Sequence, residues 1–299
     1  MVRKGYPVPD DLFPRNVLSA SEKDNLAIFG AASFDAFLRK AATGDIDWKH
    51  METDNQIALY EGRVPFLDKH GLPYLATTTF PGSVDVIAQL HDSTTHAGCL
   101  DFIHEYAPDI LDMVVLETFP SAAKTLMVKW SAVASPWPVA VSDRDFVYLE
   151  VQDRFTLPDG RTGWGYCQVS IELPHVPSLQ SSSRKLVRGV LCHTGCLYFE
   201  SATPDCVDVV YHIASDFGGH IPYWARTHGI KSRVKQLLLL SSKGHEDPAK
   251  RARETCGLCE KPASWFFRRL RQCNSCGEVS ARAMIVTVFR ALDGLCQVP

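Results

Sequence analysis

The feature that most constrains the fold is a series of strand-like segments that ends in one amphipathic helix. The segments are enriched in β-branched and aromatic residues and are separated by Pro, Gly, Asp or Ser clusters. They are KTLMVKWSAV, DRDFVYLEV, GWGYCQVSIEL, LVRGVLCHTGCLYFES and CVDVVYHIASDF, between residues 124 and 217. The stretch 221–240 follows, with Ile230, Val234, Leu237 and Leu238 at helical spacing. We therefore predict an α+β fold in which a long, curved antiparallel sheet is closed by a C-terminal helix.

The first third of the chain is less regular. Residues 19–42 carry a cap-like Ser21 followed by helical apolar spacing, which predicts a leading helix. Two short pieces, IALYEGRV and PYLATTTF, are strand-like. A second helical section is predicted from Ser83 to about Asp112, with a break near Pro108.

Composition limits the classes of partner. The chain has 299 residues, 45% hydrophobic and 22% charged, and a net charge of -3, so no overall basic field attracts nucleic acid. The N-terminus lacks the apolar run of a signal peptide, and no stretch approaches the roughly 20 apolar residues that span a bilayer. We therefore expect a soluble cytoplasmic protein with no nucleic-acid partner. The 10 cysteines are then expected to be thiols or metal ligands rather than disulfides.

Several motifs together are similar to a known family. They are Trp130, then Arg144–Tyr148, then Val187–Gly189, then Asp205, and finally Asp216–Trp224 with the sequence DFGGHIPYW. Their order resembles the StAR-related lipid-transfer (START) domain over roughly residues 45–240. The resemblance implies a helix-grip fold that holds one lipid in an internal cavity, with the C-terminal helix and a loop between neighbouring strands as the gate. We expect residues 154–163, RFTLPDGRTG, to be that loop.

Period-two alternation places Phe146, Tyr148 and Glu150 on one face of their strand, and the resemblance would turn this face inward. Because a carboxylate in an apolar cavity is costly unless it is paired or protonated, Glu150 would contact a head group or hydroxyl. The alternative is that Glu150 faces solvent and that Val147, Leu149 and Val151 form the wall. The other candidate lipid-binding residues are the polar Tyr166, His193, Tyr198 and Tyr211, and Val234 and Leu238 of the closing helix.

The sequence shows no motif for catalysis. There is no Gly-x-Ser-x-Gly elbow, no His-Glu-x-x-His, no phosphate loop and no dinucleotide fingerprint. Glu150 or His193 could serve acid-base chemistry in a cavity, but no nucleophile and base can be paired from the sequence. We predict that the protein is not an enzyme.

The segment CGLCEKPASWFFRRLRQCNSCGEVS, residues 256–280, carries two Cys-x-x-Cys pairs. With the run RRLRQCNSCG it resembles the first half of a FYVE zinc finger. That family binds two zinc ions in a cross-braced way, whereas only Cys296 follows Cys276 here, and the signature histidines are absent. Two outcomes stay open: a metal-free segment, or one tetrahedral Zn²⁺ bound by Cys256, Cys259, Cys273 and Cys276.

We predict four parts: an N-terminal helical segment (1–44), a START-like domain (45–242), a charged linker (243–255) and an incomplete FYVE-like segment (256–299). The expected function is lipid binding for transfer or sensing at membranes. The alternative is an adaptor in which the same parts contact a protein partner. The basic and aromatic run Trp265–Arg269 is either a weak peripheral membrane contact or a solvated linker.

Overall fold

The computed structural model describes residues 5–42, 46–63, 71–91, 93–119, 124–219, 221–241, 270–272 and 279–281. The chain divides into two compact units, Met1–His245 and Glu246–Pro299. In the second unit, β12 (Leu270–Gln272) pairs antiparallel with β13 (Val279–Ala281). All other elements belong to the first unit.

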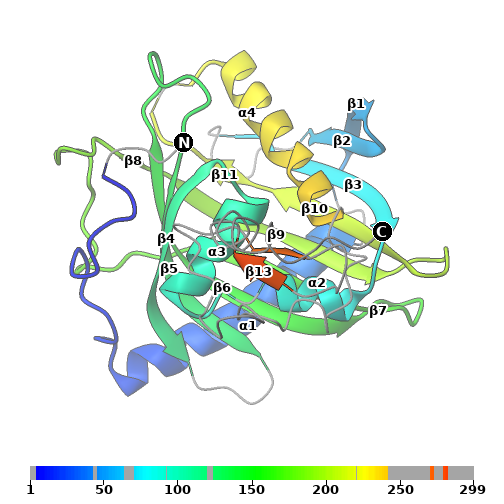
Figure 1. The fold of residues 1–299 in the computed structure, drawn as a ribbon, viewed down its shortest axis with the longest axis horizontal. Coiled ribbons are helices and arrows are strands. Elements are labelled where there is room, and N and C mark those ends of the chain that lie inside the picture. The colour runs from blue at the N-terminus through cyan, green and yellow to red at the C-terminus, as the bar shows by residue number, and fades with distance from the viewer. Residues whose placement is uncertain are drawn as a thin grey trace, which may run out of the picture. The chain divides into compact units, whose positions relative to one another are not determined.

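The first unit is built on one 11-stranded sheet (Figure 1). Its main path is antiparallel throughout, and β3 and β10 lie side by side although they are far apart in the chain. In spatial order the strands are β1 (Trp48–Asp54), β2 (Ile57–Gly62), β3 (Tyr74–Pro81), β10 (Cys206–Ile213), β9 (Val190–Glu200), β7 (Thr162–Ser170), β6 (Arg144–Thr156), β5 (Thr125–Val133) and β4 (Ile110–Phe119). Two short strands complete it, with β11 (Ser215–Asp216) on β9 and β8 (Val187–Arg188) on β6. The predicted antiparallel sheet is confirmed.

The helix α1 (Ala20–Ala42) packs on one face of the sheet. Phe34 and Phe37 are buried there, in the same core as Leu149 and Val151. Gly30 allows the close approach, because a Cβ at this position would lie 3.0 Å from side-chain atoms of both Leu149 and Val151. The helix is capped by Ser19 rather than by the predicted Ser21. The Ser19 N–H donates to the Glu22 carboxylate at 2.8 Å, and the Glu22 N–H donates to Ser19 Oγ at 3.3 Å.

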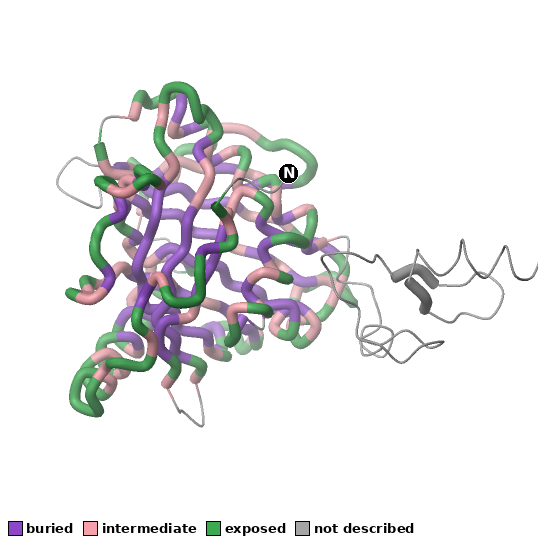
Figure 2. Tube along the Cα trace, turned by 60° about the vertical axis from the view of Figure 1, so that its left-hand side comes forward, coloured by how far each residue is buried: buried purple, intermediate pink, exposed green. Residues whose placement is uncertain are grey.

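The opposite face of the sheet is covered by α2 (Val84–Leu90), α3 (His96–Tyr106), α4 (Tyr223–Lys235) and α5 (Leu237–Ser241). Their apolar residues form a second core with the alternate residues of the central strands, such as Trp164, Tyr198 and Val209. Figure 2 shows the buried central strands between these more exposed outer layers. The predicted closing helix is present, but it divides at Gln236 into α4 and α5.

Two strands of the first unit, β4 and β1, were not predicted. The helical section expected from Ser83 to Asp112 is two short helices, because Ser83 caps α2 and Thr95 caps α3, and its last residues already belong to β4. The edge strand β1 has the sequence WKHMETD, whose polar side chains are mostly exposed and give no apolar signal.

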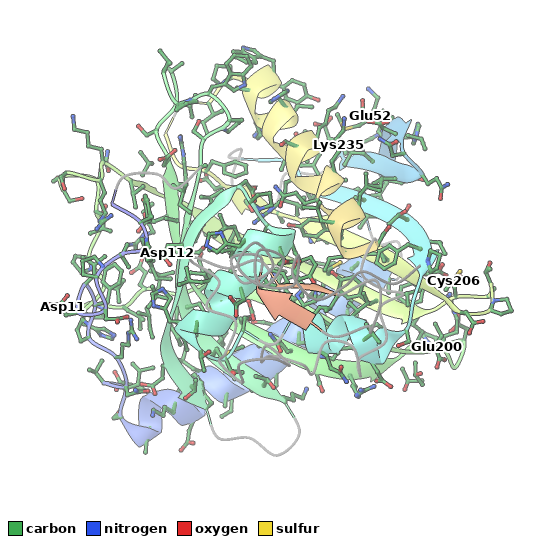
Figure 3. The ribbon with its side chains drawn as sticks, viewed as in Figure 1. Asp11, Glu52, Asp112, Glu200, Cys206 and Lys235 are labelled. Carbon is green, nitrogen blue, oxygen red and sulfur yellow. The ribbon has the colours of Figure 1, made fainter. Side chains whose placement is uncertain are left out.

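Buried carboxylates on β4 hold the segment that precedes α1. The Val8 N–H donates to Asp112 at 2.5 Å and the Leu18 N–H donates to Glu117 at 3.2 Å. Figure 3 shows Asp112 on the same side of the sheet as this segment. On the far side of the unit, ion pairs join Lys231 of α4 to Glu52 and Lys235 to Asp54 of β1. No helix among the described residues is long and apolar enough to cross a membrane.

Candidate functional site

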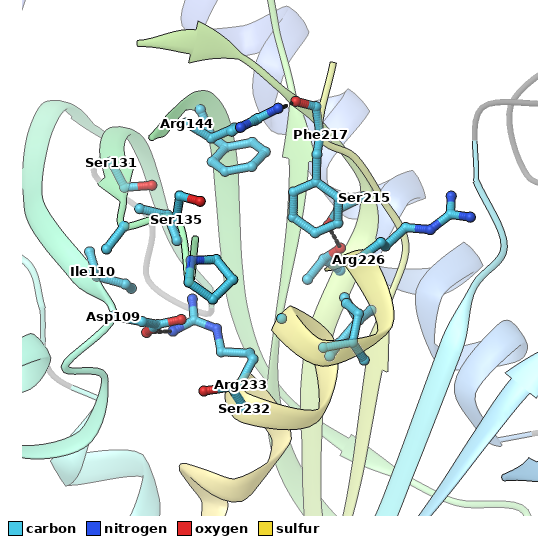
Figure 4. A pocket seen from close by; sticks show the side chains of 18 of the residues that line it. Asp109, Ile110, Ser131, Ser135, Arg144, Ser215, Phe217, Arg226, Ser232 and Arg233 are labelled. Atoms are coloured by element: carbon cyan, nitrogen blue, oxygen red, sulfur yellow. Dashed lines mark hydrogen bonds and ion pairs between the residues drawn. The ribbon is translucent and has the colours of Figure 1, made fainter. Parts of the chain in front are cut away.

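A cavity of about 240 Å³ lies between α4 and the inner face of the sheet, and we call it the main cavity (Figure 4). The wall is formed by the turn before β4, the loop 134–143, residues of β4, β5, β6, β7, β9, β10 and β11, and α4. Most of the wall is apolar, and its apolar residues include Ile110, Met113, Val133, Phe146, Leu191, Ile213, Phe217, Ile221, Ala225 and Ile230. The period-two alternation of the strands produces this wall, because every second side chain faces α4.

A smaller space of about 70 Å³, the second pocket, adjoins the main cavity. The two share five wall residues, which are Ile110, Met113, Gln168, Tyr211 and Arg233. The rest of the second pocket is mainly aromatic, with His91, Phe102, Tyr106, Tyr166 and Tyr198, and α5 adds Leu237 and Leu240.

A buried ion pair lies at the wall of the second pocket. Lys129 Nζ is 2.8 Å from Glu150 Oε1 and donates to Ser93 Oγ at 2.6 Å. Glu150 also accepts hydrogen bonds from the amides of Gln152 at 2.9 Å and Gln168 at 2.8 Å. Burial alone would raise the pKa of Glu150, but Lys129 and the two amides outweigh it and lower the pKa below its usual value. Glu150 is therefore ionised and acts only as an acceptor.

His91 is a neutral member of the same pocket. Burial lowers its pKa to about 3, although Glu150 opposes the shift. Its Nε2 lies 3.1 Å from the Tyr198 hydroxyl. The rings of Phe102, Trp164, Tyr166 and Tyr198 surround it, with centroids 4.8 to 5.4 Å away.

The loop 134–143 meets the first half of α4 at the wall of the main cavity, and we call this place the mouth. Trp137 of the loop packs edge-on against Trp224, with ring centroids 5.3 Å apart, and against His228 at 5.7 Å. Both indoles remain accessible, since Trp137 is 43% and Trp224 57% exposed. Val139, at the tip of the loop, is fully exposed.

The structure brings most of the predicted lipid-binding residues together. Phe146, Tyr148 and Tyr211 line the main cavity, and Glu150, Tyr166, Tyr198 and Tyr211 line the second pocket. Glu150 is 4% exposed and faces the pocket, so the alternative in which it faces solvent is wrong. Val147, Leu149 and Val151 pack in the core beneath α1 instead. The roles of the inward residues in binding lipid stay predictions.

Three predicted residues lie outside the walls of both cavities. Val234 is buried in the core beneath α4, and Leu238 packs against the same core, but neither lines a cavity. His193 lies on the α1 side, where its Nδ1 is 3.3 Å from Lys40 Nζ. The cause is a bulge, because the β7–β9 register skips His193, whose φ is 58°.

The predicted gate loop, residues 154–163, is also absent from the described walls of both cavities. It forms the tip of the β6–β7 hairpin, where Arg154 pairs with Asp85 and Arg161 with Asp208. β6 has 13 residues and begins at the mouth, so its far end lies about 40 Å away at about 3.3 Å per residue. The loop 134–143 occupies the mouth instead.

Sequence reasoning missed Lys129, Gln152, Gln168 and Ser93, which complete the Glu150 network. One signal was available, because Lys129 interrupts an apolar run in KTLMVKWSAV. A lysine between apolar neighbours on a central strand requires a buried partner. The partner itself depends on the register between β5 and β6, which sequence alone does not fix.

The cysteines predicted as zinc ligands, Cys256, Cys259, Cys273 and Cys276, lie outside the described residues. Within the part of the chain that is described, no group of three or more His, Cys, Asp or Glu side chains could hold a metal ion.

No protein-family model and no curated protein matches the sequence. Solved structures do match the fold. Human StAR-related lipid transfer protein 5 has a TM-score of 0.58 at 16% identity, covering 74% of this chain and 97% of that one. Human STARD10 has a TM-score of 0.55 at 13% identity, covering 74% and 81%.

The lipid transfer and protein localization domain of human StarD13 (DLC2) has a TM-score of 0.50 at 16% identity, covering 72% of this chain and 96% of that one. The three neighbours share the curved sheet closed by a C-terminal helix. The chain therefore has the helix-grip fold of the START domain, as the sequence predicted.

Proposed function

We propose that the protein binds a single lipid in the main cavity and carries it between membranes. The observation that supports this most is the main cavity itself, an apolar space between sheet and helix in a fold whose solved neighbours include two proteins named for lipid transfer. Each methylene that leaves a bilayer gives up about 0.8 kcal/mol of apolar burial. An apolar cavity wall supplies a similar free energy of burial, so the free-energy change of transfer from membrane to protein is close to zero.

The cavity is small for this task. Its volume of about 240 Å³ is below the roughly 300–1,000 Å³ of most ligand pockets. The second pocket adjoins it, and α4 is held at its flanks by ion pairs that are partly exposed, such as Lys231 with Glu52. Exposed pairs of this kind contribute only about 0–1 kcal/mol each. These ion pairs alone would oppose an outward movement of α4 only weakly, and we propose that α4 moves when lipid enters.

We propose that the mouth contacts membranes. Trp137, Val139, Tyr223 and Trp224 are exposed around it, with Tyr223 at 50%. Tryptophan and tyrosine suit the interface of a bilayer, because one end of each ring is apolar and the other can hydrogen-bond. This peripheral contact accords with a cytoplasmic location, which we also propose. The effect of Trp137→Ala with Trp224→Ala on sedimentation with phosphatidylcholine vesicles tests it, with exposed Ile28→Ala on α1 as the control.

We propose a carrier rather than a catalyst. Glu150, the only carboxylate among the described residues of the second pocket, is engaged by Lys129 and two amides, and His91 is neutral and bonded to Tyr198. These partners support a structural or binding role for both groups. Catalysis would instead require one of them to be released for proton transfer.

The position of Gly229 allows a direct test. It lies on α4 at the wall of the main cavity, and an added Cβ would lie 3.7 Å from Pro136, an ordinary contact. Gly229→Phe should fill the cavity and abolish lipid uptake, whereas the matched Gly229→Ala should bind lipid normally. Native mass spectrometry after exposure to total lipid would measure both. Wild-type protein that carries no lipid under these conditions would refute the carrier and favour the adaptor.

A further inference from the structure

We infer that the outward face of α1 is a dimer interface, where a second copy of this chain packs antiparallel against the same helix. Exposed apolar side chains on α1, the charges around them and the position of α1 on the sheet support this interface. The dimer goes beyond the proposed lipid binding, and its formation does not depend on which ligand the main cavity holds.

Apolar side chains gather on the outward face of α1. Ile28 is 71% and Phe29 43% exposed, Val17 just before the helix is 49% exposed, and Ala32 is exposed one turn after Ile28. We call these four residues the α1 patch. The core side of α1 is filled by other residues, among them Phe34. Isoleucine and phenylalanine also favour a helix less than alanine, glutamate or lysine do, so a contact with another molecule accounts for the patch better than folding does.

The α1 patch lies on the other side of the sheet from the mouth. α1 packs on one face of the sheet and α4 on the opposite face (Figure 1). A bilayer that contacts the mouth therefore leaves the α1 patch in water. The exposed charged residues of α1 are mainly acidic, and they are Glu22, Asp24, Asp35 and Arg39. Because anionic membrane surfaces attract basic helices, this face suits a protein rather than a bilayer.

The lysines of α1 are turned towards the rest of the first unit. Lys23 Nζ lies 2.9 Å from the Glu117 carboxylate, and Lys40 Nζ lies 3.3 Å from Nδ1 of His193. The exposed face of α1 therefore has acidic residues in its first turns and its exposed cation in its last turn. A helix with opposite charges at its two ends is complementary to an identical helix that runs in the opposite direction. Two copies related by a two-fold axis meet in this way.

The antiparallel arrangement joins the apolar and the charged features of α1. When the two-fold axis passes between Ala31 and Ala32, Asp24 of each copy lies opposite Arg39 of the other. The alanines are small enough for the helix axes to approach to about 8–10 Å, as packed helices do. Ile28 of each copy then packs against Ala32 of the other. The two ion pairs lie about 22 Å apart along the helix, one on each side of this apolar contact.

A contact of one helix from each copy is small. Stable complexes bury about 1,200–2,000 Å² in total, and a single pair of helices lies at or below the lower end of this range. The dimer should therefore dissociate on dilution and form again at higher protein concentration. Both mouths remain accessible in it, because each lies on the face of its sheet that does not carry α1.

Sedimentation velocity of the full chain over roughly a hundredfold range of concentration tests the interface. The wild-type protein should shift from monomer to dimer as the concentration rises. Ile28→Glu should lower the association constant about tenfold or more, because it places a charge in the centre of the contact. The matched control Leu239→Glu, on exposed Leu239 of α5, should leave association unchanged. A monomer at every concentration would overturn the inference, and so would a dimer that Ile28→Glu does not weaken.

Charge reversal tests whether the second molecule is an antiparallel copy. Asp24→Arg alone and Arg39→Asp alone should each weaken self-association, because each places like charges opposite one another at both ends of the contact. An equal mixture of these two variants should associate more tightly than either variant alone, since every pair across the interface then joins opposite charges. Urea denaturation of each variant verifies that it is folded. A mixture no tighter than its components would overturn the antiparallel dimer, and vesicle binding that Ile28→Glu abolished would identify a membrane as the occupant instead.

Discussion

Lys129 and Glu150 meet diagonally across β5 and β6. Their direct partners in the ladder are Tyr148 for Lys129 and Met127 for Glu150, yet Nζ and Oε1 lie 2.8 Å apart. Diagonal neighbours on one face of an antiparallel pair are within reach of long side chains. The lysine stem thus crosses the inner face of the sheet to place its charge at the second pocket.

Breaking this pair on one side should be costly. We expect Lys129→Met to lower the free energy of unfolding by about 3–5 kcal/mol, because it leaves the Glu150 carboxylate buried without its counterion. Lys129→Met with Glu150→Leu should cost much less, since no charge remains buried. Urea denaturation of the three proteins measures both. Equal losses of unfolding free energy in the single and double variants would contradict this explanation, because only the single variant leaves a charge buried without a partner.

Stability should fall in acid because of His91. Burial holds the pKa of His91 at about 3 in the folded protein, below the usual 6.5, so the unfolded chain binds more protons between these values. Its contribution is fully present above pH 6.5 and is lost as the pH falls towards 3, with a slope of about 1.4 kcal/mol per pH unit. His91→Phe should reduce the pH dependence of the free energy of unfolding.

Locking the mouth should block lipid uptake. A Cβ built at Gly229 lies 3.7 Å from Cγ of Pro136, so the loop 134–143 and α4 are in contact at these two positions. We expect Pro136→Cys with Gly229→Cys to stop uptake when oxidised and to restore it on reduction, because the loop can no longer separate from α4.

The hairpin tip provides the matched control for this lock. Thr156 and Thr162 are direct partners in the β6–β7 ladder, so cysteines there would join only the two strands of that hairpin. Uptake should continue in the oxidised control. If lipid uptake stopped in the oxidised control and continued in the oxidised mouth variant, the result would favour residues 154–163 as the gate.

The C-terminal cysteines should hold at most one zinc ion per chain, because the ligands of two cross-braced sites are not present in the sequence. If one ion is bound, Cys273→Ser should release it and leave the helix-grip unit folded, since ligation stabilises such small modules only locally. If none is bound, chelators should leave lipid binding unchanged. Elemental analysis of purified protein decides between these outcomes, and two ions per chain would contradict the ligand count.

Alternation along one strand could be predicted, but relations between strands could not. Phe146, Tyr148 and Glu150 share the inner face as expected, because a strand of regular pleat fixes which side chains lie together. The bulge at His193 breaks that regularity and turns the residue towards α1. Whether a strand contains a bulge depends on its partner's register, which the local sequence does not record.

The sequence also could not show which loop lies beside α4, because this too depends on relations between distant elements. The loop 134–143 and the predicted loop 154–163 both join neighbouring strands and have turn-like sequences, so composition does not distinguish them. The choice depends on which end of β6 lies beside α4, and this is set by tertiary packing, with Trp137 against Trp224 at that end. Lys129 was missed because its partner lies on another strand, although the interruption of an apolar run was visible.

The pairing of β3 with β10 has a consequence for how the protein is made. Tyr74 pairs with Ile213, so the first three strands have no neighbour on that side until the ribosome has released most of the first unit. Pairings between distant parts of a chain form slowly, because closing a long loop costs conformational entropy before any favourable contact can form. During synthesis the inner edge of β3 is therefore an open strand that other chains can pair with. Aggregation through the open edge of β3 should therefore be greatest in the interval before β10 has been synthesised.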